Sequence, residues 1–476
     1  MTSSESNRGS RFRPLLLARA WIARYPAAVF WLPVLRLGLF QFGLGVALAP
    51  ITGTLNRVLI TDLKVPAVAV AFLIALHFFV SPIRMLIGYR SDRQRAIGRW
   101  RTPYIVLGGM LTYGGLATAP FSLIVLGSDR IPFPVAMLIC TAIFLTYGVG
   151  VNIVETAFLA LVSDLTPAED RGRVVAALWM MLILGTIVGS IVGGVLLATY
   201  THIMLIRVMQ GSATIFIVLT FAALLGREKM RPDGTLVSVS EPAPIRLTLR
   251  ESLDTLWRAP VLRQLFGVLF LATLGFAVQD VLLEPYGGEV LGMTIASTTR
   301  LTALWGLSMI VGAATAGAVL CRGRSAALPL VIGGAVGAIG FGLIVVSGTI
   351  VDMTVFHAGV ALIGMGRGLF ITAAIALVMA LADDQHAGLF VSLWGVTQAL
   401  AQGFGTIGGG ITRDVATQVS GNVASGYYVV YVAAAGALVG SLVLVAVLRL
   451  GNKIRQGAVR SPWGALRDLP ADQMIS

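Results

Sequence analysis

The chain has 476 residues, of which 57% are hydrophobic and only 12% are charged. A soluble protein has about 25% charged residues, and a fold of this size cannot cover its surface with half that share. The composition therefore excludes a cytosolic enzyme, a nucleic-acid-binding domain and a disordered protein. It predicts a chain surrounded mostly by lipid, so the formal charge of +13 has to be explained by how the chain is placed in the membrane.

Long apolar stretches recur along the chain. A helix needs about 20 apolar residues to cross the hydrocarbon core of a bilayer. On that template we expect an all-α polytopic membrane protein with twelve transmembrane helices, at residues 33–56, 66–88, 103–126, 134–161, 174–199, 203–225, 262–284, 295–320, 327–347, 352–380, 389–411 and 426–448. The remaining segments are a basic N-terminal arm (1–32), a polar linker (226–261) and a C-terminal tail (449–476).

The basic residues orient these helices. With the N-terminus inside, 26 of the 35 Lys and Arg residues fall in segments on the cytoplasmic side, whereas five fall on the opposite side. Cytoplasmic loops of membrane proteins carry such an excess. The pattern predicts that both termini are cytoplasmic. Cys321 then lies on the reducing side, and we expect no disulfide between it and Cys140.

An internal repeat divides the chain into two halves. The segment from Gly148 (GVGVNIVETAFLALV) matches the segment from Gly364 (GMGRGLFITAAIALV) at an offset of 216 residues. The shared Gly-x-Gly, Thr-Ala and Ala-Leu-Val place the fourth helix on the tenth. This register predicts two pseudo-symmetric six-helix halves, 33–225 and 262–448, around an axis normal to the membrane.

The loop after the second helix resembles a signature of the major facilitator superfamily, G-x-x-x-D-R-x-G-R-[RK]. The matching residues are Gly88, Asp92, Arg93, Gly98, Arg99 and Arg101. In that superfamily these residues latch the two halves together on the cytoplasmic side, so the resemblance implies the major facilitator fold and such a latch. The loop departs from the signature by three extra residues before Gly98, which argues against a tight latch.

Three further stretches narrow the resemblance: QDVLLEPYGGE (279–289), SPIR (81–84) and RTPYI (101–105). Together they resemble the PucC/LhaA family, the bacteriochlorophyll-delivery branch of the major facilitator superfamily in purple phototrophs. The basic arm and the chain length are most similar to its LhaA members. The resemblance covers essentially all twelve helices.

This resemblance implies a non-enzymatic assembly factor for the core light-harvesting antenna, light-harvesting 1. Such a factor binds bacteriochlorophyll as cargo and delivers it to the antenna α and β polypeptides in the bacterial inner membrane or intracytoplasmic photosynthetic membrane. Carotenoid or another lipid is an alternative cargo, and bacteriochlorophyll synthase and the membrane-insertion machinery are further candidate partners. No nucleotide-binding motif is found and no nucleic-acid partner is expected. The competing hypothesis is a proton-coupled secondary transporter of a small solute or pigment precursor, coupled through Glu155 or Asp280.

Two ionisable residues fall deep inside predicted spans. Arg367 lies near the middle of the tenth helix and Glu155 well inside the fourth. In the repeat, Arg367 aligns with Val151 and Glu155 with Ile371, so equivalent faces carry one base and one acid. Because either charge alone is costly in lipid, we expect a buried Glu155–Arg367 pair across the axis, with either a structural role or a role at a cargo site.

Other polar residues in the spans are open to two interpretations. His77, among aromatic residues, is either an axial ligand for a pigment magnesium or a packing residue hydrogen-bonded to a neighbour. Gln279, Asp280 and Glu284 lie toward the outer end of the seventh helix; the two acids could hold a proton, a magnesium or a headgroup, or form a structural tie to Tyr286 or an outer Arg. We expect the side chains that lie near helix ends to extend toward the headgroups: Arg36, Arg84 and Arg207.

Overall fold

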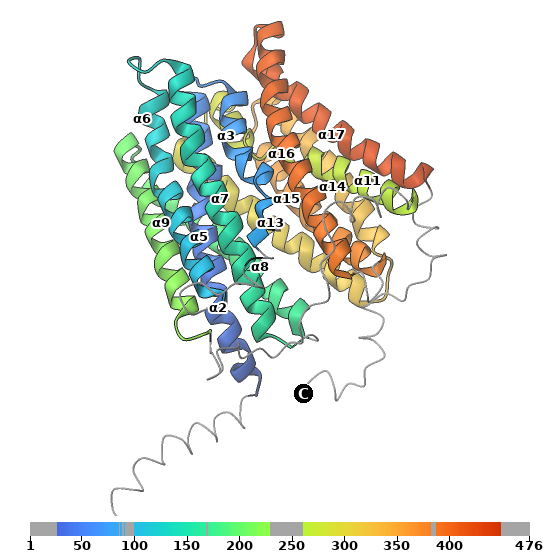
Figure 1. Cartoon of the computed structure of the whole chain (residues 1–476). Coiled ribbons are helices and arrows are strands. Elements are labelled where there is room, and N and C mark those ends of the chain that lie inside the picture. The colour runs from blue at the N-terminus through green and yellow to red at the C-terminus, as the bar shows by residue number, and fades with distance from the viewer. Residues whose placement is uncertain are drawn as a thin grey trace, which may run out of the picture.

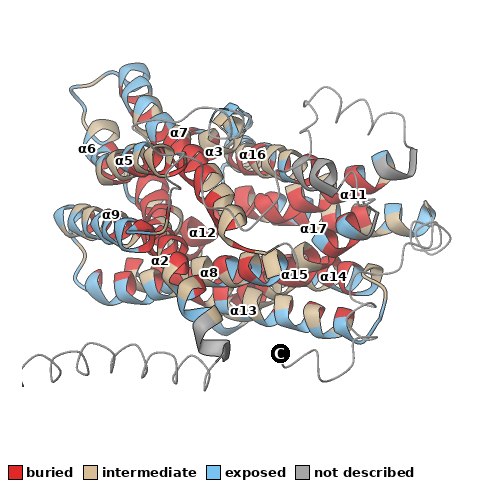
Figure 2. Ribbon diagram, turned by 60° about the horizontal axis from the view of Figure 1, so that its bottom comes forward, coloured by how far each residue is buried: buried red, intermediate tan, exposed pale blue. Residues whose placement is uncertain are grey.

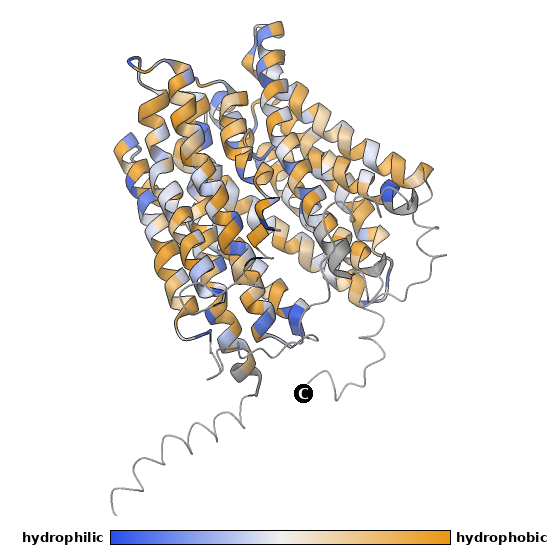
Figure 3. Cartoon of the chain, viewed as in Figure 1, coloured by the Kyte–Doolittle hydropathy of each residue, from blue (hydrophilic) through white to orange (hydrophobic). Residues whose placement is uncertain are grey.

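The computed structural model describes residues 26–84, 86, 87, 90, 100–167, 170–228, 260–381 and 387–448. The described chain is helical, and its helices form two bundles that lie side by side (Figure 1). Hydrophobic residues predominate along the helices of both bundles (Figure 3), and the buried residues run along the inside (Figure 2). This arrangement fits a protein whose outer surface meets lipid.

The first bundle is built from residues 26–228. Its helices, in chain order, are α2 (Pro26–Pro50) with the π-helices η1 (Ile51–Leu55) and η2 (Val58–Asp62), α3 (Ala67–Phe79), α5 (Thr102–Thr118) with η3 (Ala119–Phe121) and α6 (Ser122–Leu126), α7 (Phe133–Leu165), α8 (Arg171–Leu196) and α9 (His202–Leu224). Helix α2 packs on α8 and α9, and α7 packs on α3 and α5.

The second bundle repeats this plan. Its helices are α11 (Pro260–Ala277) with α12 (Leu283–Glu289), α13 (Ile295–Cys321), α14 (Ala327–Ile350), α15 (Met353–Leu381), α16 (Ala387–Ser420) and α17 (Val423–Val447). Helix α15 packs on α13 and α14, and α11 packs on α16 and α17. The two bundles meet where α8 packs on α13 and α3 packs on α16.

Each expected span overlaps helix in the described residues, but several ends differ. Within the described residues, nine helical stretches are long and apolar enough to cross a membrane. Helix α3 and the Arg263–Ala277 stretch are shorter apolar helices, whereas α16 is long but more polar. The first helix starts at Pro26, inside the expected arm, and continues to Asp62. Pro50 has no N–H to donate, and the helix widens into a π-helix directly after it.

The second and seventh spans are interrupted. Helix α3 stops at Phe79, before Pro82, because proline disfavours helical geometry in the residue that precedes it. Helix α11 stops at Ala277, and a turn leads into α12. Gln279 and Asp280 therefore lie in the break between two helices rather than on one continuous helix face.

The repeat has a direct structural counterpart in two pairs of glycines. A Cβ on Gly148 would come within 3.0 Å of the backbone of His77 on α3, and one on Gly364 within 2.5 Å of the backbone of Trp305 on α13. Two residues further on, Gly150 meets the α5 backbone and Gly366 meets the α14 backbone. The fourth and tenth helices thus contact equivalent neighbours, in agreement with the register predicted from the sequence.

Candidate functional site

Polar side chains in the membrane-spanning region of the first half gather at the end of α3. The Arg84 guanidinium donates to the Glu155 carboxylate on α7 at 2.7 Å and also to the side-chain carbonyl of Asn152. Asn152 in turn donates to the backbone carbonyls of His77 and Gly148. Arg84 therefore neutralises Glu155 within its own half, and the expectation that Arg84 extends toward the headgroups is wrong.

A second ion pair lies in the other half. Nη1 of Arg367 on α15 donates to Oδ1 of Asp280 at 2.6 Å, and its guanidinium lies 5.3 Å from the ring centre of Trp305. Gln279 also donates to Oδ1 of Asp280, at 2.9 Å, while its own buried side-chain oxygen has no partner among the described residues. The break in the seventh helix places both side chains beside the tenth helix.

The predicted Glu155–Arg367 pair is therefore wrong. The structure joins Glu155 to Arg84 and Arg367 to Asp280, so each half neutralises its own central charge. The repeat correctly placed both residues on equivalent helices, but symmetry alone gives no information on which nearby residue supplies the opposite charge. The nearer partners come from the ends of the second and seventh helices.

Glu284 lies apart from these pairs, at the boundary between the halves. Its side chain is buried and accepts hydrogen bonds from Thr302 on α13 at 3.0 Å and from Asn56 on the first helix at 3.3 Å. Asn56 also donates to the backbone carbonyl of Val281. Among the described residues, no cation pairs with Glu284, and Tyr286 donates instead to the carbonyl of Ile344. The structural tie expected between these acids and Tyr286 is thus absent from the described contacts.

A larger ionic network joins the halves near Glu284. The Glu289 carboxylate accepts from Arg413 at 2.5 Å, from Tyr427 at 2.8 Å and from Lys64 at 3.1 Å. Lys64 belongs to the first half and the other three residues to the second. Asp414, which also pairs with Arg413, accepts from the backbone N–H of Val68 at the start of α3. We call this set the outer network: Lys64, Val68, Glu289, Arg413, Asp414 and Tyr427.

Arg57 adds a neighbouring contact between the halves. Its side chain is buried, pairs with Asp62 at 3.3 Å and donates to the backbone carbonyl of Met293 at 3.1 Å. A Cβ on Gly288 would come within 3.0 Å of the Arg57 guanidinium. The second glycine of the PYGG stretch therefore leaves room for an arginine from the opposite half.

The described part of the loop signature forms a contact within one half instead of the expected latch between the halves. Five of its residues, Gly88, Asp92, Arg93, Gly98 and Arg99, lie outside the described residues. The sixth, Arg101, donates to Asp164 on α7 at 2.9 Å, inside the same half. The carboxylate of Glu228 caps the start of α5 by accepting from the backbone N–H groups of Trp100, Arg101 and Thr102. Although burial opposes it, this bonding lowers the pKa of Glu228 below its ordinary value.

One ring nitrogen of His77 is available to bind a ligand. Its Nδ1 lies 2.7 Å from the backbone carbonyl of Ile74, so Nδ1 carries the proton and Nε2 has a free lone pair. Among the described residues, none hydrogen-bonds to Nε2. The imidazole is half-buried and packs against the rings of Phe78 and Tyr147. A neutral imidazole with one free nitrogen is a common metal ligand, so His77 has the chemistry of an axial magnesium ligand.

Sequence reasoning missed most of the outer network. Its charged members lie outside the predicted spans, and we predicted no contacts for them. A usable signal was present, because acids and bases cluster near the outer ends of the first, seventh and eleventh spans. Both cysteines are free in the structure, with Cys140 buried and Cys321 exposed.

Comparison with solved structures identifies the fold. A nucleoside transporter, NupG, matches with a TM-score of 0.66 at 14% identity, covering 87% of this chain and 99% of that one. A bacterial homologue of the human lysosomal transporter Spinster, in an inward-facing and unoccupied conformation, matches with a TM-score of 0.61 at 13% identity, over 87% and 94%. The chain therefore has the transporter-like fold of the major facilitator superfamily.

Sequence comparison identifies the family. The profile of the family described as PUCC protein matches residues 54–452. Protein PucC of Rhodovulum sulfidophilum is 39% identical over 80% of this chain and 85% of its own length. An uncharacterized protein encoded in the puhA-bchM intergenic region of Rhodobacter capsulatus is 36% identical over 93% and 94%. A protein named bacteriochlorophyll synthase 44.5 kDa chain, also from Rhodobacter capsulatus, is 31% identical over 81% and 88%. By both the family profile and these relatives, this multi-pass membrane protein belongs to the PucC family.

Proposed function

We propose that the protein is an assembly factor for the core light-harvesting antenna, light-harvesting 1, and that it acts without catalysis. It binds bacteriochlorophyll, with carotenoid or another lipid as alternative cargo, and presents it to the antenna α and β polypeptides inside the membrane. Membership of the PucC family and a relative named after bacteriochlorophyll synthase support this proposal. Bacteriochlorophyll synthase and the membrane-insertion machinery are the further partners we propose.

The observation that carries the proposal is the free Nε2 of His77 between aromatic rings. The nearby charges of Arg84 and Glu155 satisfy each other, so the imidazole remains neutral and available beside an apolar surface. A pigment with a central magnesium needs an axial ligand, and the free Nε2 of His77 can supply one.

The test is the absorption spectrum of the full chain purified from a phototrophic host in mild detergent. Bacteriochlorophyll should co-purify with the wild-type protein. His77→Phe keeps the ring and removes the nitrogen, so it should lose most of the pigment. His357→Leu removes another half-buried histidine and should retain it. A wild-type protein without pigment, or equal pigment in all three proteins, contradicts the pigment-binding proposal.

A deletion strain tests the role in the cell. Loss of the protein should lower the amount of assembled antenna while bacteriochlorophyll synthesis continues. Normal antenna levels together with a defect in the uptake of a solute would instead support the transporter hypothesis.

One observation favours that second candidate, proton-coupled transport. Glu155 and Asp280, the expected coupling residues, are both held in ion pairs, whereas Glu284 is buried with neutral partners, Thr302 and Asn56. A carboxyl in that setting can take up a proton without breaking an ion pair. Glu284→Gln should abolish proton-driven uptake if the protein is a transporter, and should leave antenna assembly intact if it is an assembly factor.

We further propose that the protein lies in the bacterial inner membrane or the intracytoplasmic photosynthetic membrane with both termini in the cytoplasm. Reporter fusions after Lys64, Arg130 and Arg413 should then report the periplasm. Fusions after Arg95, Gly234 and Lys453 should report the cytoplasm. A single reversed site contradicts the topology. The ends of the bundles are called cytoplasmic and periplasmic below on this basis.

A further inference from the structure

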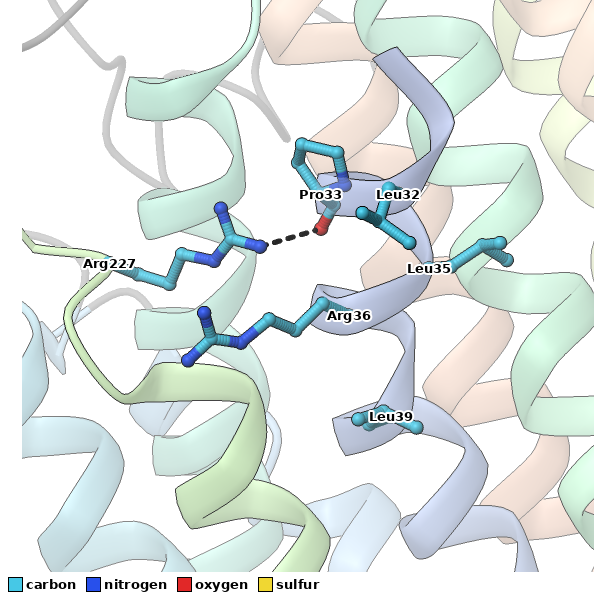
Figure 4. A pocket seen from close by; sticks show the side chains of 6 residues that line it. All are labelled: Leu32, Pro33, Leu35, Arg36, Leu39 and Arg227. Carbon is cyan, nitrogen blue, oxygen red and sulfur yellow. Dashed lines mark hydrogen bonds between the residues drawn. The ribbon is translucent and has the colours of Figure 1, made fainter. Parts of the chain in front are cut away.

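A pocket opens at the cytoplasmic end of the first half, between α2 and the chain that follows α9 (Figure 4). Its volume is about 500 Å³, and four of its six lining side chains are apolar: Leu32, Pro33, Leu35 and Leu39. The other two are Arg36 and Arg227, whose side chains extend toward each other from α2 and from the loop after α9. The pocket thus combines an apolar wall with two positive charges.

The two guanidinium groups are bonded to neutral atoms. Arg36 donates to the backbone carbonyls of Ala222 at 3.1 Å and Leu225 at 2.5 Å, at the C-terminal end of α9. Arg227 donates to the carbonyl of Pro33 at 3.4 Å, and its buried Nε has no hydrogen-bond partner among the described residues. Burial and the charge of Arg36 both lower the pKa of Arg227, although the guanidinium stays protonated.

The carboxylate next in sequence does not compensate these charges. Glu228 directs both of its oxygens to the start of α5, where they accept from Trp100, Arg101 and Thr102. In the part of the chain that the structure describes, no acid forms an ion pair with Arg36 or Arg227. Two like charges held together in this way leave an excess positive potential, which an anion would relieve.

Two leucines of the apolar wall are exposed. Leu32 is 63% exposed and Leu35 is 48% exposed, near the start of a helix that is otherwise largely buried. In a membrane protein, exposed leucines of this kind contact lipid. A ligand for this pocket must therefore be anionic at one end and apolar at the other. We infer that the pocket binds the headgroup of an anionic phospholipid, with the phosphodiester between Arg36 and Arg227 and an acyl chain along Leu32, Leu35 and Leu39.

This ligand fits the chemistry of the pocket. Guanidinium groups form strong, charge-assisted hydrogen bonds with phosphate oxygens, and the cytoplasmic surface of a membrane is rich in anionic lipid. The bound headgroup would also hold the start of the linker, through Arg227, against the first transmembrane helix. The site is independent of the proposed pigment function, because it involves neither His77 nor the central ion pairs.

The experiment compares the melting temperature of the full chain in nanodiscs of phosphatidylcholine with that in nanodiscs that also contain phosphatidylglycerol. Phosphatidylglycerol should raise the Tm of the wild type by about 2–4 °C, as expected for a ligand that binds only the folded state. Arg227→Gln should melt like the wild type in phosphatidylcholine but lose the rise, and Arg227→Lys should keep part of it. Arg324→Gln, which removes an exposed arginine on the same side, should keep all of it.

Three results would overturn the inference. Equal wild-type melting temperatures in the two lipids would exclude a stabilising headgroup. An equal loss of the Tm rise in Arg227→Gln and Arg324→Gln would show only diffuse attraction. The same Tm rise on adding inorganic phosphate to phosphatidylcholine nanodiscs would assign the site to a free anion. Native mass spectrometry of the wild type needs no variant: the protein should retain phosphatidylglycerol over phosphatidylcholine, and equal retention contradicts the site.

Discussion

The centre of the molecule and its periplasmic end use charge in opposite ways. In the centre, Arg84 pairs with Glu155 and Arg367 pairs with Asp280, each inside one half. At the periplasmic end, Lys64 pairs with Glu289 across the halves, and Asp414 accepts from Val68 across them. The halves can therefore move apart in the centre without leaving a charge unpaired, whereas separating them at the periplasmic end breaks charged contacts.

The central pairs should give the largest effects on stability. Arg367→Leu leaves Asp280 in the membrane interior without its cation, and we expect a loss of about 3–5 kcal/mol, measured as a lower melting temperature and poor accumulation. The double variant Arg367→Leu with Asp280→Asn removes both charges and should recover much of that loss. The matched double variant Arg367→Leu with Glu155→Leu should be as damaged as the sum of its two single variants. Recovery in this second double variant, and not in the first, would mean that the charges pair across the halves.

Changes in the outer network should have the next largest effect on stability. They should also change how easily the two halves separate. Arg413→Gln removes a charged hydrogen bond from buried Glu289, which costs about 1.5–3 kcal/mol. Because the lost contacts hold the halves together, we expect easier opening of the periplasmic end. Thr54, which is buried and hydrogen-bonded to Thr299 across the halves, reports this opening when changed to Cys in a chain without its native cysteines.

Labelling of Thr54→Cys by a membrane-impermeant maleimide measures that opening. Its rate should rise about tenfold with Arg413→Gln, since a shift of 1.4 kcal/mol changes an opening equilibrium tenfold. Arg130→Gln, at an exposed residue on the same end, serves as the control and should leave the rate unchanged. An unchanged rate with Arg413→Gln would mean that the network does not hold the end closed.

The cap of α5 should give a smaller, pH-dependent effect within one half. Glu228→Gln should lower stability by about 0.5–2 kcal/mol at pH 7, in the range of a lost helix cap. The pKa of Glu228 is lower in the folded than in the unfolded protein, so its stabilisation is complete above the ordinary value of about 4.5. It is lost as the pH falls through the lower, folded-state pKa. The difference in melting temperature between wild type and Glu228→Gln should therefore shrink at acid pH, and a difference that grows would contradict the cap.

Lys64→Gln should have the smallest effect, although it removes a pair between the halves. The Lys64 side chain is 72% exposed, so solvent screens its charge, and Glu289 keeps Arg413 and Tyr427. We expect a loss of less than about 1 kcal/mol that disappears at high salt. A loss as large as that of Arg413→Gln would show that this pair contributes more than its exposure implies.

The sequence predicted the large-scale organisation well because hydrophobic length and repeats are properties of the chain itself. The sequence repeat matched Gly148 with Gly364, and the structure confirms this match because both glycines contact the backbone of an equivalent neighbouring helix. Helix ends were less predictable. Hydrophobic periodicity alone predicts neither the π-helices after Pro50 nor the break that contains Gln279 and Asp280.

The site was predicted as a set of residues but not as a set of contacts. Glu155, Arg367 and Asp280 are indeed engaged in polar contacts within the membrane, yet the cation that meets Glu155 comes from Arg84, which we had assigned to the headgroups. Lipid penalises an unpaired charge wherever it lies, so hydropathy shows that a partner must exist. It does not show which of several nearby residues the tertiary fold brings within reach.

The paired glycines also limit which residues each half can accept at equivalent positions. Gly148 and Gly364 each lie close to a neighbouring backbone, which an added Cβ would approach to 3.0 Å and 2.5 Å respectively. The charged positions did not stay matched, since Val151 stands opposite Arg367 and Ile371 opposite Glu155. The close approach of helices at these crossings disfavours larger side chains in both halves. Positions outside the crossings carry no such restriction, so the two halves share a symmetric scaffold while their charged residues differ.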